Sequence, residues 1–168
     1  MTSVNPDIFK EAMARFASGV TVITTLFNKE PIGITATSFA SLSLDPPLVL
    51  INVGKNAFTH QVITDSGIFA VSVLTTEQHE LGMRFAGMLP EVEDRFAGVD
   101  IVTAVTGCPL LANSIMAVDC RVWAHYDGGD HTIFVGEVVG AVVSEKQERP
   151  LLYYNRDWQR GEPLDHSH

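Results

Sequence analysis

The side chains best suited to chemistry lie between residues 35 and 52. This stretch reads TATSFASLSLDPPLVLIN and places short hydroxyl groups between two apolar runs and a double proline, Pro46 and Pro47. Short hydroxyls and accessible main-chain amides at a strand end can bind a ligand rich in carbonyls and phosphate oxygens. The prolines restrict the segment to an extended shape. The stretch therefore suggests a ligand site, and the ligand that it suggests is a flavin.

A flavin site needs hydrogen-bond partners for the ring, a cradle for the phosphate and an open ring face. Candidates for the ring are the residues at an expected strand end and two serines that alternate with leucines, so that their hydroxyls share one face. These candidates are Thr35, Ala36, Thr37, Ser38, Ser41 and Ser43. The alternative is that these hydroxyls only satisfy the backbone of a turn.

Candidates for the phosphate surround the start of an expected helix over residues 56–66. There, free backbone amides and the helix dipole favour an anion, and a lysine adds positive charge. The residues are Asn52, Lys55, Asn56 and Thr59. The plainer interpretation makes Asn56 a helix cap and Lys55 a solvated charge.

Two further places supply candidates. Arg84, Phe85 and Ala86 end an expected helix, where the arginine could contact a phosphate or the ring edge. His131 follows a glycine-rich turn, although a histidine in such a place is usually a surface residue. The histidines and aspartates around this turn could be drawn as a metal cluster, but turn preference explains them better. We therefore predict no metal site.

Composition indicates one globular domain over residues 1–168. Hydrophobic residues make up 46% and charged residues 18% of the 168 residues, so a large apolar surface must be buried, partly against a copy of the chain. The net charge of −9 argues against binding to nucleic acid. We expect no signal peptide and no membrane span, and hence a cytoplasmic protein with two buried free thiols, Cys108 and Cys120.

The residue pattern predicts a mainly β protein with short helices. Helices are expected from Asn5-Pro6 to about Gly19, over 56–66 and over 75–86, with Thr75 and Gln78 forming a capping box. Strands are expected over 20–27, 32–39, 48–53, 68–74, 101–105, 115–126 and 132–144. Without strand–helix alternation, six or seven strands fit a closed or nearly closed barrel. Segment 91–98 is expected to be a short helix or loop, and 155–168 a tail, disordered or lying across a surface.

Three segments together resemble the short-chain flavin reductases, which have the FMN-binding split-barrel fold and serve two-component flavin monooxygenases. The first is FASGVTVIT (16–24) with GITATSFASLS (33–43) and PPL (46–48). The second is FAVSVL (69–74) with RFA (84–86), and the third runs from GDH (129–131) to GEV (136–138). The likeness extends from about Phe9 to Tyr154, and its specificity lies in the first and third segments combined.

The resemblance implies a six-stranded Greek-key split barrel, a homodimer and a flavin groove near the dimer interface. It implies hydride transfer from NADH or NADPH to FMN or FAD, and diffusion of the reduced flavin to a separate monooxygenase. Residues 35–38 would run along the isoalloxazine and ribityl chain, His131 would position the nicotinamide, and Tyr154 would lie near the nucleotide. Because no Gly-x-Gly-x-x-Gly motif is present, the barrel surface must hold the nucleotide.

Three alternatives stay open at this point. A split-barrel protein could retain FMN tightly and act on another small substrate, or it could bind flavin without turnover. The hydroxyls could also merely complete turns in a barrel that has no affinity for flavin. The sequence leaves open NADH against NADPH, FMN against FAD, and the identity of the oxygenase.

Overall fold

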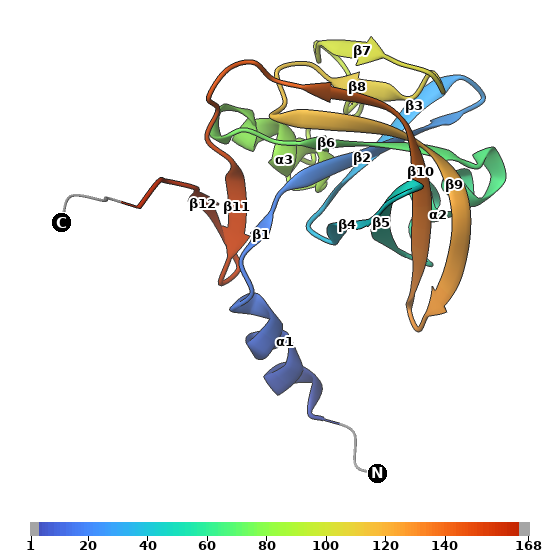
Figure 1. Ribbon diagram of the computed structural model, residues 1–168. Helices are drawn as coiled ribbons and strands as arrows, with labels where there is room; N and C mark the ends of the chain where they lie inside the picture. The colour runs from blue at the N-terminus through green and yellow to red at the C-terminus, as the bar shows by residue number, and fades with distance from the viewer. Residues whose placement is uncertain (1–3, 165–168) are drawn as a thin grey trace.

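The computed structural model describes residues 4–164, and its main feature is a curled antiparallel sheet of seven strands (Figure 1). The strand order is β3-β2-β6-β9-β10-β5-β4. The strands are β2 (Thr21–Phe27), β3 (Glu30–Ala36), β4 (Phe39–Leu44), β5 (Pro47–Gly54), β6 (Ile68–Val73), β9 (Met116–Gly128) and β10 (His131–Val143). This architecture confirms the expected mainly β, split-barrel fold, with seven strands in the main sheet.

Two smaller sheets and three helices surround the barrel. One sheet has the order β1-β11-β12 and the other pairs β7 with β8. The strands are β1 (Ser18–Gly19), β7 (Ile101–Thr103), β8 (Pro109–Leu111), β11 (Leu151–Tyr154) and β12 (Asp157–Arg160). The helices are α1 (Pro6–Ala14), α2 (Phe58–Ser66) and α3 (His79–Phe85), and the 3-10 turn η1 (Thr76–Gln78) precedes α3. No helix within residues 4–164 is long and apolar enough to cross a membrane.

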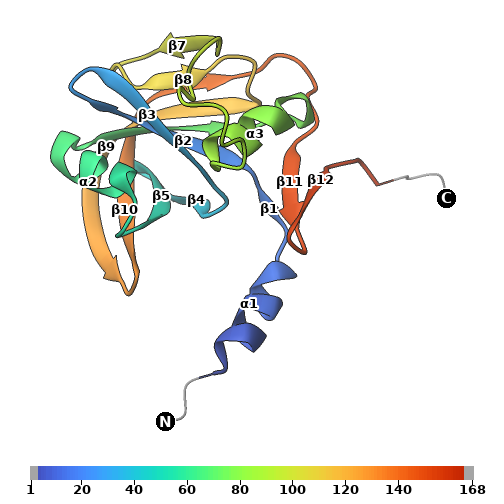
Figure 2. The ribbon, with the colours of Figure 1, turned by 180° about the vertical axis from the view of Figure 1, so that it is seen from behind.

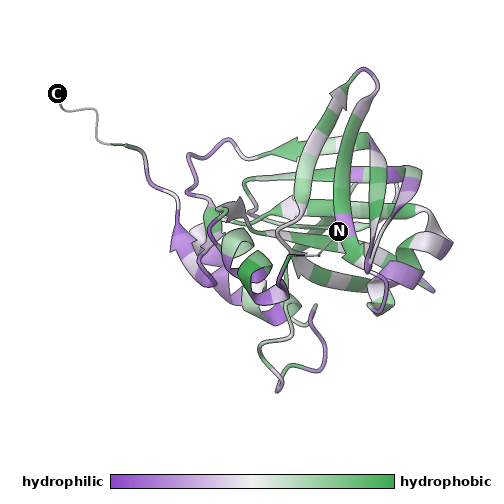
Figure 3. Ribbon diagram, turned by 90° about the horizontal axis from the view of Figure 1, so that it is seen from below, coloured by the Kyte–Doolittle hydropathy of each residue, from purple (hydrophilic) through white to green (hydrophobic). Residues whose placement is uncertain are grey.

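The barrel interior is filled by large apolar side chains from several strands and from α2. Ile51, Ile63, Phe69 and Phe134 are all buried there. Packing is close at Gly136, where a Cβ atom would lie 2.7 Å from Cε1 of Phe69. The strands are largely apolar, with polar residues interspersed (Figure 3), and along β5 burial alternates, so that Val49, Ile51 and Val53 are buried.

A second apolar cluster lies between the barrel and α3, which covers β2 and β3 when the molecule is seen from behind (Figure 2). Strand β2 serves both clusters, because Ile23 enters the barrel interior and Val22 the second cluster. The predicted capping box of Thr75 and Gln78 is present at η1, and Gly67 ends α2 in a left-handed conformation.

The barrel is split because β3 and β4 are the two edges of the curled sheet. Near the split, Ser38 and Asn52 are joined by hydrogen bonds that link the segment after β3 to β5. The remaining edge of β3 has no strand partner within residues 4–164. An edge without a partner strand leaves main-chain donors and acceptors free for other groups.

Helix α1 projects from the barrel at the N-terminal end (Figure 1). The side chain of Asn5 caps the helix by accepting hydrogen bonds from the main-chain amides of Asp7 and Ile8, and Pro6 occupies the first turn, as predicted. None of its residues is buried, and Ile8, Phe9 and Met13 are more than half exposed.

Several boundaries differ from the sequence-based expectations. Helix α1 ends at Ala14, because the following residues lead into β1. Strand β3 ends at Ala36 and a separate β4 follows. Pro46 lies in the turn between β4 and β5, and Pro47 begins β5. Ala57, not Asn56, is the N-cap of α2. Segment 91–98 forms turns and contains no helix, which is the looped form of the two that were expected.

The expected tail over 155–168 also needs correction. Asp157–Arg160 form β12, because Trp158 packs against the second cluster and the strand pairs with β11. Residues 165–168 lie outside the described part of the chain.

Candidate functional site

A groove of about 460 Å³ runs beside the split, between the end of β3, β5, the β9–β10 turn and β11–β12. It brings together many of the predicted residues from separate parts of the chain. Those that line it are Thr35, Ala36, Thr37, Ser38, Asn52, Ala86 and His131. The groove is therefore the first candidate for the ligand site.

The main chain of β3 faces this groove. Residues of an antiparallel strand direct their N–H and C=O groups alternately to either side. The carbonyl of Gly33 accepts a hydrogen bond from Arg95 (3.3 Å), so it points away from β2. Thr35, two residues later, must point its N–H and C=O the same way. Its hydroxyl is already engaged, because it donates to the Gly82 carbonyl at 2.7 Å.

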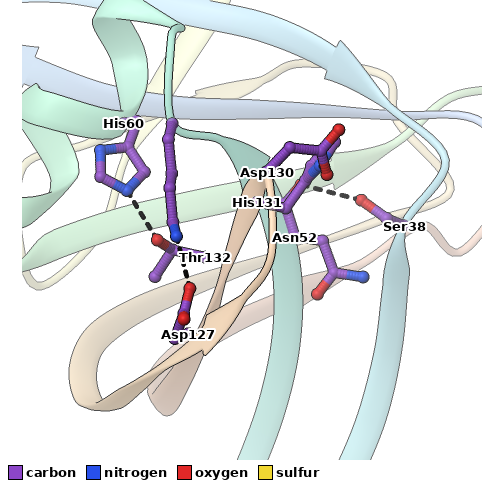
Figure 4. Close-up of polar contacts among 8 residues, drawn as sticks. Ser38, Asn52, His60, Asp127, Asp130, His131 and Thr132 are labelled. Atoms are coloured by element: carbon purple, nitrogen blue, oxygen red, sulfur yellow. Dashed lines mark hydrogen bonds and ion pairs between the residues drawn. The ribbon is translucent and has the colours of Figure 1, made fainter.

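Ser38 and Asn52 lie next to each other in the lining of the groove, near the split (Figure 4). The Ser38 hydroxyl donates to the Asn52 carbonyl (3.0 Å), and the Asn52 amide donates to the Ser38 carbonyl (3.3 Å). The side-chain Oδ1 of Asn52 is buried and has no hydrogen-bond partner among the described residues. A buried acceptor without a partner is unfavourable, so a ligand donor such as a flavin ring N–H or a ribityl hydroxyl would stabilise it.

His131 begins β10 at the rim of the groove. Its Nδ1 lies 2.7 Å from Oδ1 of Asp130, and this hydrogen bond holds the pKa of the Asp130 carboxyl below its ordinary value. In the same turn Asp127 forms an ion pair with Lys55, whose hydrogen bond and charge lower the pKa of Asp127 (Figure 4).

Sequence reasoning missed much of the groove, although the resemblance placed Tyr153, like Tyr154, near the nucleotide. Tyr153 from β11 and Trp158 from β12 pack edge to face with a centroid distance of 5.5 Å and form an aromatic wall. The other lining residues that it missed are apolar or glycine, namely Val20, Ile34, Val53, Gly54 and Met88. The signal at Trp158 was available, because a lone large aromatic in a polar tail needs a partner surface.

A second hollow of about 440 Å³ lies further along β3, beside the start of α2 and residues 93–96. Ile34 lines both spaces, so they adjoin. Thr59, at the start of α2, is buried as a residue and lines this hollow. No side chain caps the first turn of α2.

Arg95 supplies the positive charge of the second hollow, which the acidic residues Glu93 and Asp94 also line. Its guanidinium donates to the carbonyls of Gly33 (3.3 Å) and Phe85 (3.1 Å). It forms no ion pair with any carboxylate in residues 4–164. A half-buried guanidinium beside the amides of a helix start suits a phosphate. No sequence pattern marked Arg95, because it stands in a segment without helix or strand.

Other predicted residues lie outside both spaces. Arg84 donates to the Ala97 carbonyl (2.9 Å) and pairs with Glu80 (3.6 Å), and Phe85 is buried in the second cluster. Lys55 is held by Asp127. Ser41, Ser43, Asn56 and Tyr154 also line neither space, since β4 and the turns at 56 and 154 direct them elsewhere.

Groups that could bind metal or react as thiolates give no second site. No cluster of three histidine, cysteine or acidic side chains occurs in residues 4–164. Burial raises the pKa of Cys108 to about 11 and that of Cys120 to about 12, so both thiols stay protonated at neutral pH. The neighbouring Asp119 is fully buried and accepts hydrogen bonds from the amide and hydroxyl of Thr106.

Comparisons with known proteins agree on one family. The model of the flavin reductase like domain matches residues 13–162. The NADH-dependent FAD reductase of Streptomyces globisporus is 47% identical over 139 residues, which cover 82% of this chain and 76% of that protein. The reductase subunit HsaB of a flavin-dependent monooxygenase from Mycobacterium tuberculosis is 39% identical and covers 95% of this chain and 84% of its own length.

Solved structures give the same result. The NADH:FAD oxidoreductase SgcE6 of Streptomyces globisporus matches with a TM-score of 0.87 and 39% identity, covering 97% of this chain and 98% of that one. A structure of SgcE6 in complex with NAD and FAD fragments matches with a TM-score of 0.87 and 38% identity, covering 99% of this chain and all of that one.

Proposed function

The chain belongs to the flavin reductase-like family and is an NAD(P)H:flavin oxidoreductase, and we propose that its reaction takes place in the groove beside the open edge of β3. The observation that carries this placement is the buried, unpartnered Oδ1 of Asn52 in the groove lining. Together with the free main chain of Thr35, it offers hydrogen bonds to the polar edge of a flavin ring. When bound, the flavin accepts a hydride from the dihydronicotinamide.

In this proposal, the residues of the groove bind the flavin and orient the nicotinamide. Tyr153 and Trp158 cover one side of the groove with apolar surface and exclude water there. His131 stands at the rim and positions the nicotinamide. Alignment of donor and acceptor is what hydride transfer chiefly requires, so none of these side chains has to move a proton.

The second hollow receives the phosphate of the flavin. Arg95 supplies the charge, Thr59 a hydroxyl, and the first turn of α2 free amides. This placement keeps Thr59 and the start of α2 from the sequence-based expectation and assigns the charge to Arg95, because Lys55 is paired with Asp127 and Arg84 with Glu80. The phosphate thus lies next to the ring groove, on the other side of Ile34.

We further propose a homodimer that works in the cytoplasm. The exposed apolar side chains of α1 need a partner surface, and a second copy would supply one. The two free cysteines suit a reducing compartment. The reduced flavin leaves through the open side of the groove and reaches a separate monooxygenase. HsaB, a similar protein, is named as the reductase subunit of such an enzyme.

The test is oxidation of NADH and NADPH by the purified protein with added FMN, with added FAD, or with neither. Saturable turnover that depends on free flavin is the expected result. Turnover of a retained flavin without any addition would favour a prosthetic group and another substrate. Flavin binding without nucleotide oxidation would leave only a binding module.

A further inference from the structure

We infer that Asp130 fixes the tautomer of His131, and that the imidazole Nε2 thereby selects the carboxamide of the nicotinamide by accepting a hydrogen bond from its N–H. This inference rests on the proposed function. It assigns a positioning role to Asp130 and a specificity role to one nitrogen of His131.

The contact with Asp130 determines which nitrogen of the His131 imidazole carries the hydrogen. Nδ1 of His131 lies 2.7 Å from Oδ1 of Asp130, which is within hydrogen-bond distance. An ionised carboxylate can only accept, so Nδ1 must carry the hydrogen. In the neutral imidazole, Nε2 is then left with a lone pair and can only accept.

The other imidazole nitrogen, Nε2, lies beside Gly54 at the groove. His131 lines the groove, and a Cβ built on Gly54 would stand 3.7 Å from Nε2. Gly54 lines the groove as well. Nε2 makes no hydrogen bond within the described residues, so the groove presents one acceptor at its rim without a partner.

The turn that carries Asp130 and His131 is held by contacts with neighbouring segments. The Lys55 amide donates to the Asp130 carbonyl at 3.0 Å, and the Lys55 ammonium pairs with Asp127. Behind the turn, Nε2 of His60 lies 2.8 Å from the Thr132 hydroxyl (Figure 4). The turn is thus joined to the β5–α2 segment on both sides of His131, so the orientation of the imidazole is set before a ligand arrives.

These contacts predict a choice between chemical groups. A carboxamide has both an N–H donor and a carbonyl, whereas an acetyl group in its place has the carbonyl alone. An Nε2 acceptor can bond only to the former. The wild-type protein should therefore show a KM for NADH about three- to tenfold below that for reduced 3-acetylpyridine adenine dinucleotide, the size of one neutral hydrogen bond.

The experiment compares these two hydride donors in four variants at saturating flavin. Asp130→Ala and His131→Ala should lose the discrimination, and Asp130→Asn should keep most of it because its carbonyl still accepts from Nδ1. Asp127→Ala is the matched control. It removes an exposed carboxylate at the end of β9 that does not touch the imidazole. The bond from the Lys55 amide to the Asp130 carbonyl and the contact between His60 and Thr132 remain and still hold the turn, so this variant should keep most of the discrimination.

A second readout needs neither flavin nor nucleotide. Two-bond ¹H–¹⁵N correlation spectra of labelled protein distinguish the imidazole tautomers, and the His131→Ala spectrum identifies the signal. We expect the Nδ1–H tautomer in the wild type and in Asp127→Ala, and a shift toward Nε2–H in Asp130→Ala. An Nε2–H tautomer in the wild type, or equal KM values for the two donors there, would overturn the inference. Discrimination that survives in Asp130→Ala would overturn it also. A wild type that oxidises NADH without added flavin would instead refute the proposed function, whereas the spectra would still report whether Asp130 fixes the tautomer of His131.

Discussion

Replacing Arg95 tests where the phosphate of the flavin is bound. Arg95→Met removes the guanidinium that faces the second hollow but keeps much of its apolar stem. Because Arg95 has no carboxylate partner within residues 4–164, its charge is available to a ligand. A charge-assisted hydrogen bond contributes about 1.5–3 kcal/mol. The variant should therefore bind FMN roughly 10- to 150-fold more weakly.

The comparison with riboflavin separates this effect from a disturbed fold. Arg95 also bonds to the carbonyls of Gly33 and Phe85, so its loss could loosen the groove as well. Riboflavin lacks the phosphate, and its affinity would report such loosening alone. We expect the FMN-to-riboflavin affinity ratio to fall in Arg95→Met and to be partly kept in Arg95→Lys.

Flavin fluorescence titration provides the dissociation constants, and Lys55→Met is the matched control. Lys55 is the cation that the sequence suggested for the phosphate, yet it pairs with Asp127 and lines neither space. Its removal should leave the FMN-to-riboflavin ratio unchanged. Equal weakening of FMN and riboflavin in Arg95→Met, or a phosphate-specific loss in Lys55→Met, would refute the placement.

Three other predictions concern stability and the thiols. Gly136→Ala should lower the free energy of unfolding in urea by about 1–3 kcal/mol, because its Cβ would overlap the ring of Phe69. Asp119→Ala should cost about 1–3 kcal/mol for each donor that it leaves buried and unpaired, as measured by the same titration. Cys108 and Cys120 should not react with a disulfide reagent at pH 8 in the native protein, because burial raises the pKa of each. Since the thiols of the unfolded chain ionise first, near the ordinary value of 9.0, the unfolding free energy should fall between about pH 9 and 11.

Each of these predictions has a control or a contradicting result. Gly19→Ala adds a Cβ with nothing within 4 Å and should unfold like the wild type. Comparable loss in Gly19→Ala would show that main-chain flexibility, and not overlap, explains the Gly136 variant. Unchanged stability of Asp119→Ala would mean that water replaces the carboxylate. Rapid labelling of either thiol at pH 8 would show that the buried state opens readily.

The sequence predicted the features that local pattern determines. β-branched runs and the glycine turn placed the long hairpin, and so the position of His131 at its mouth. The hydroxyl-rich stretch placed Thr35 to Ser38 at the groove. The groups that Thr35 offers differ from those expected, however. Its hydroxyl donates to the Gly82 carbonyl in α3, so its main-chain groups are the ones that remain free for a ligand.

The rest depended on contacts between distant segments. Lys55 looked like an available cation until the fold brought Asp127, 72 residues away, into contact with it. Trp158 looked like part of a polar tail because its partners, such as Tyr153 and Leu151, become a surface only after β11 pairs with β12. Arg95 lay in a segment with no periodic pattern, where sequence gives no direction to a side chain.

The open edge of β3 also bears on how this protein tolerates mutation. Peptide groups are the same whatever side chain is attached, so substitutions along the strand cannot delete a hydrogen bond made by the main chain. They can do so only through proline or a change of register. A site on such an edge therefore keeps its main-chain hydrogen bonds to the ligand while its side chains vary. New preferences for ring substituents or nucleotides can arise through side-chain changes that leave these hydrogen bonds in place.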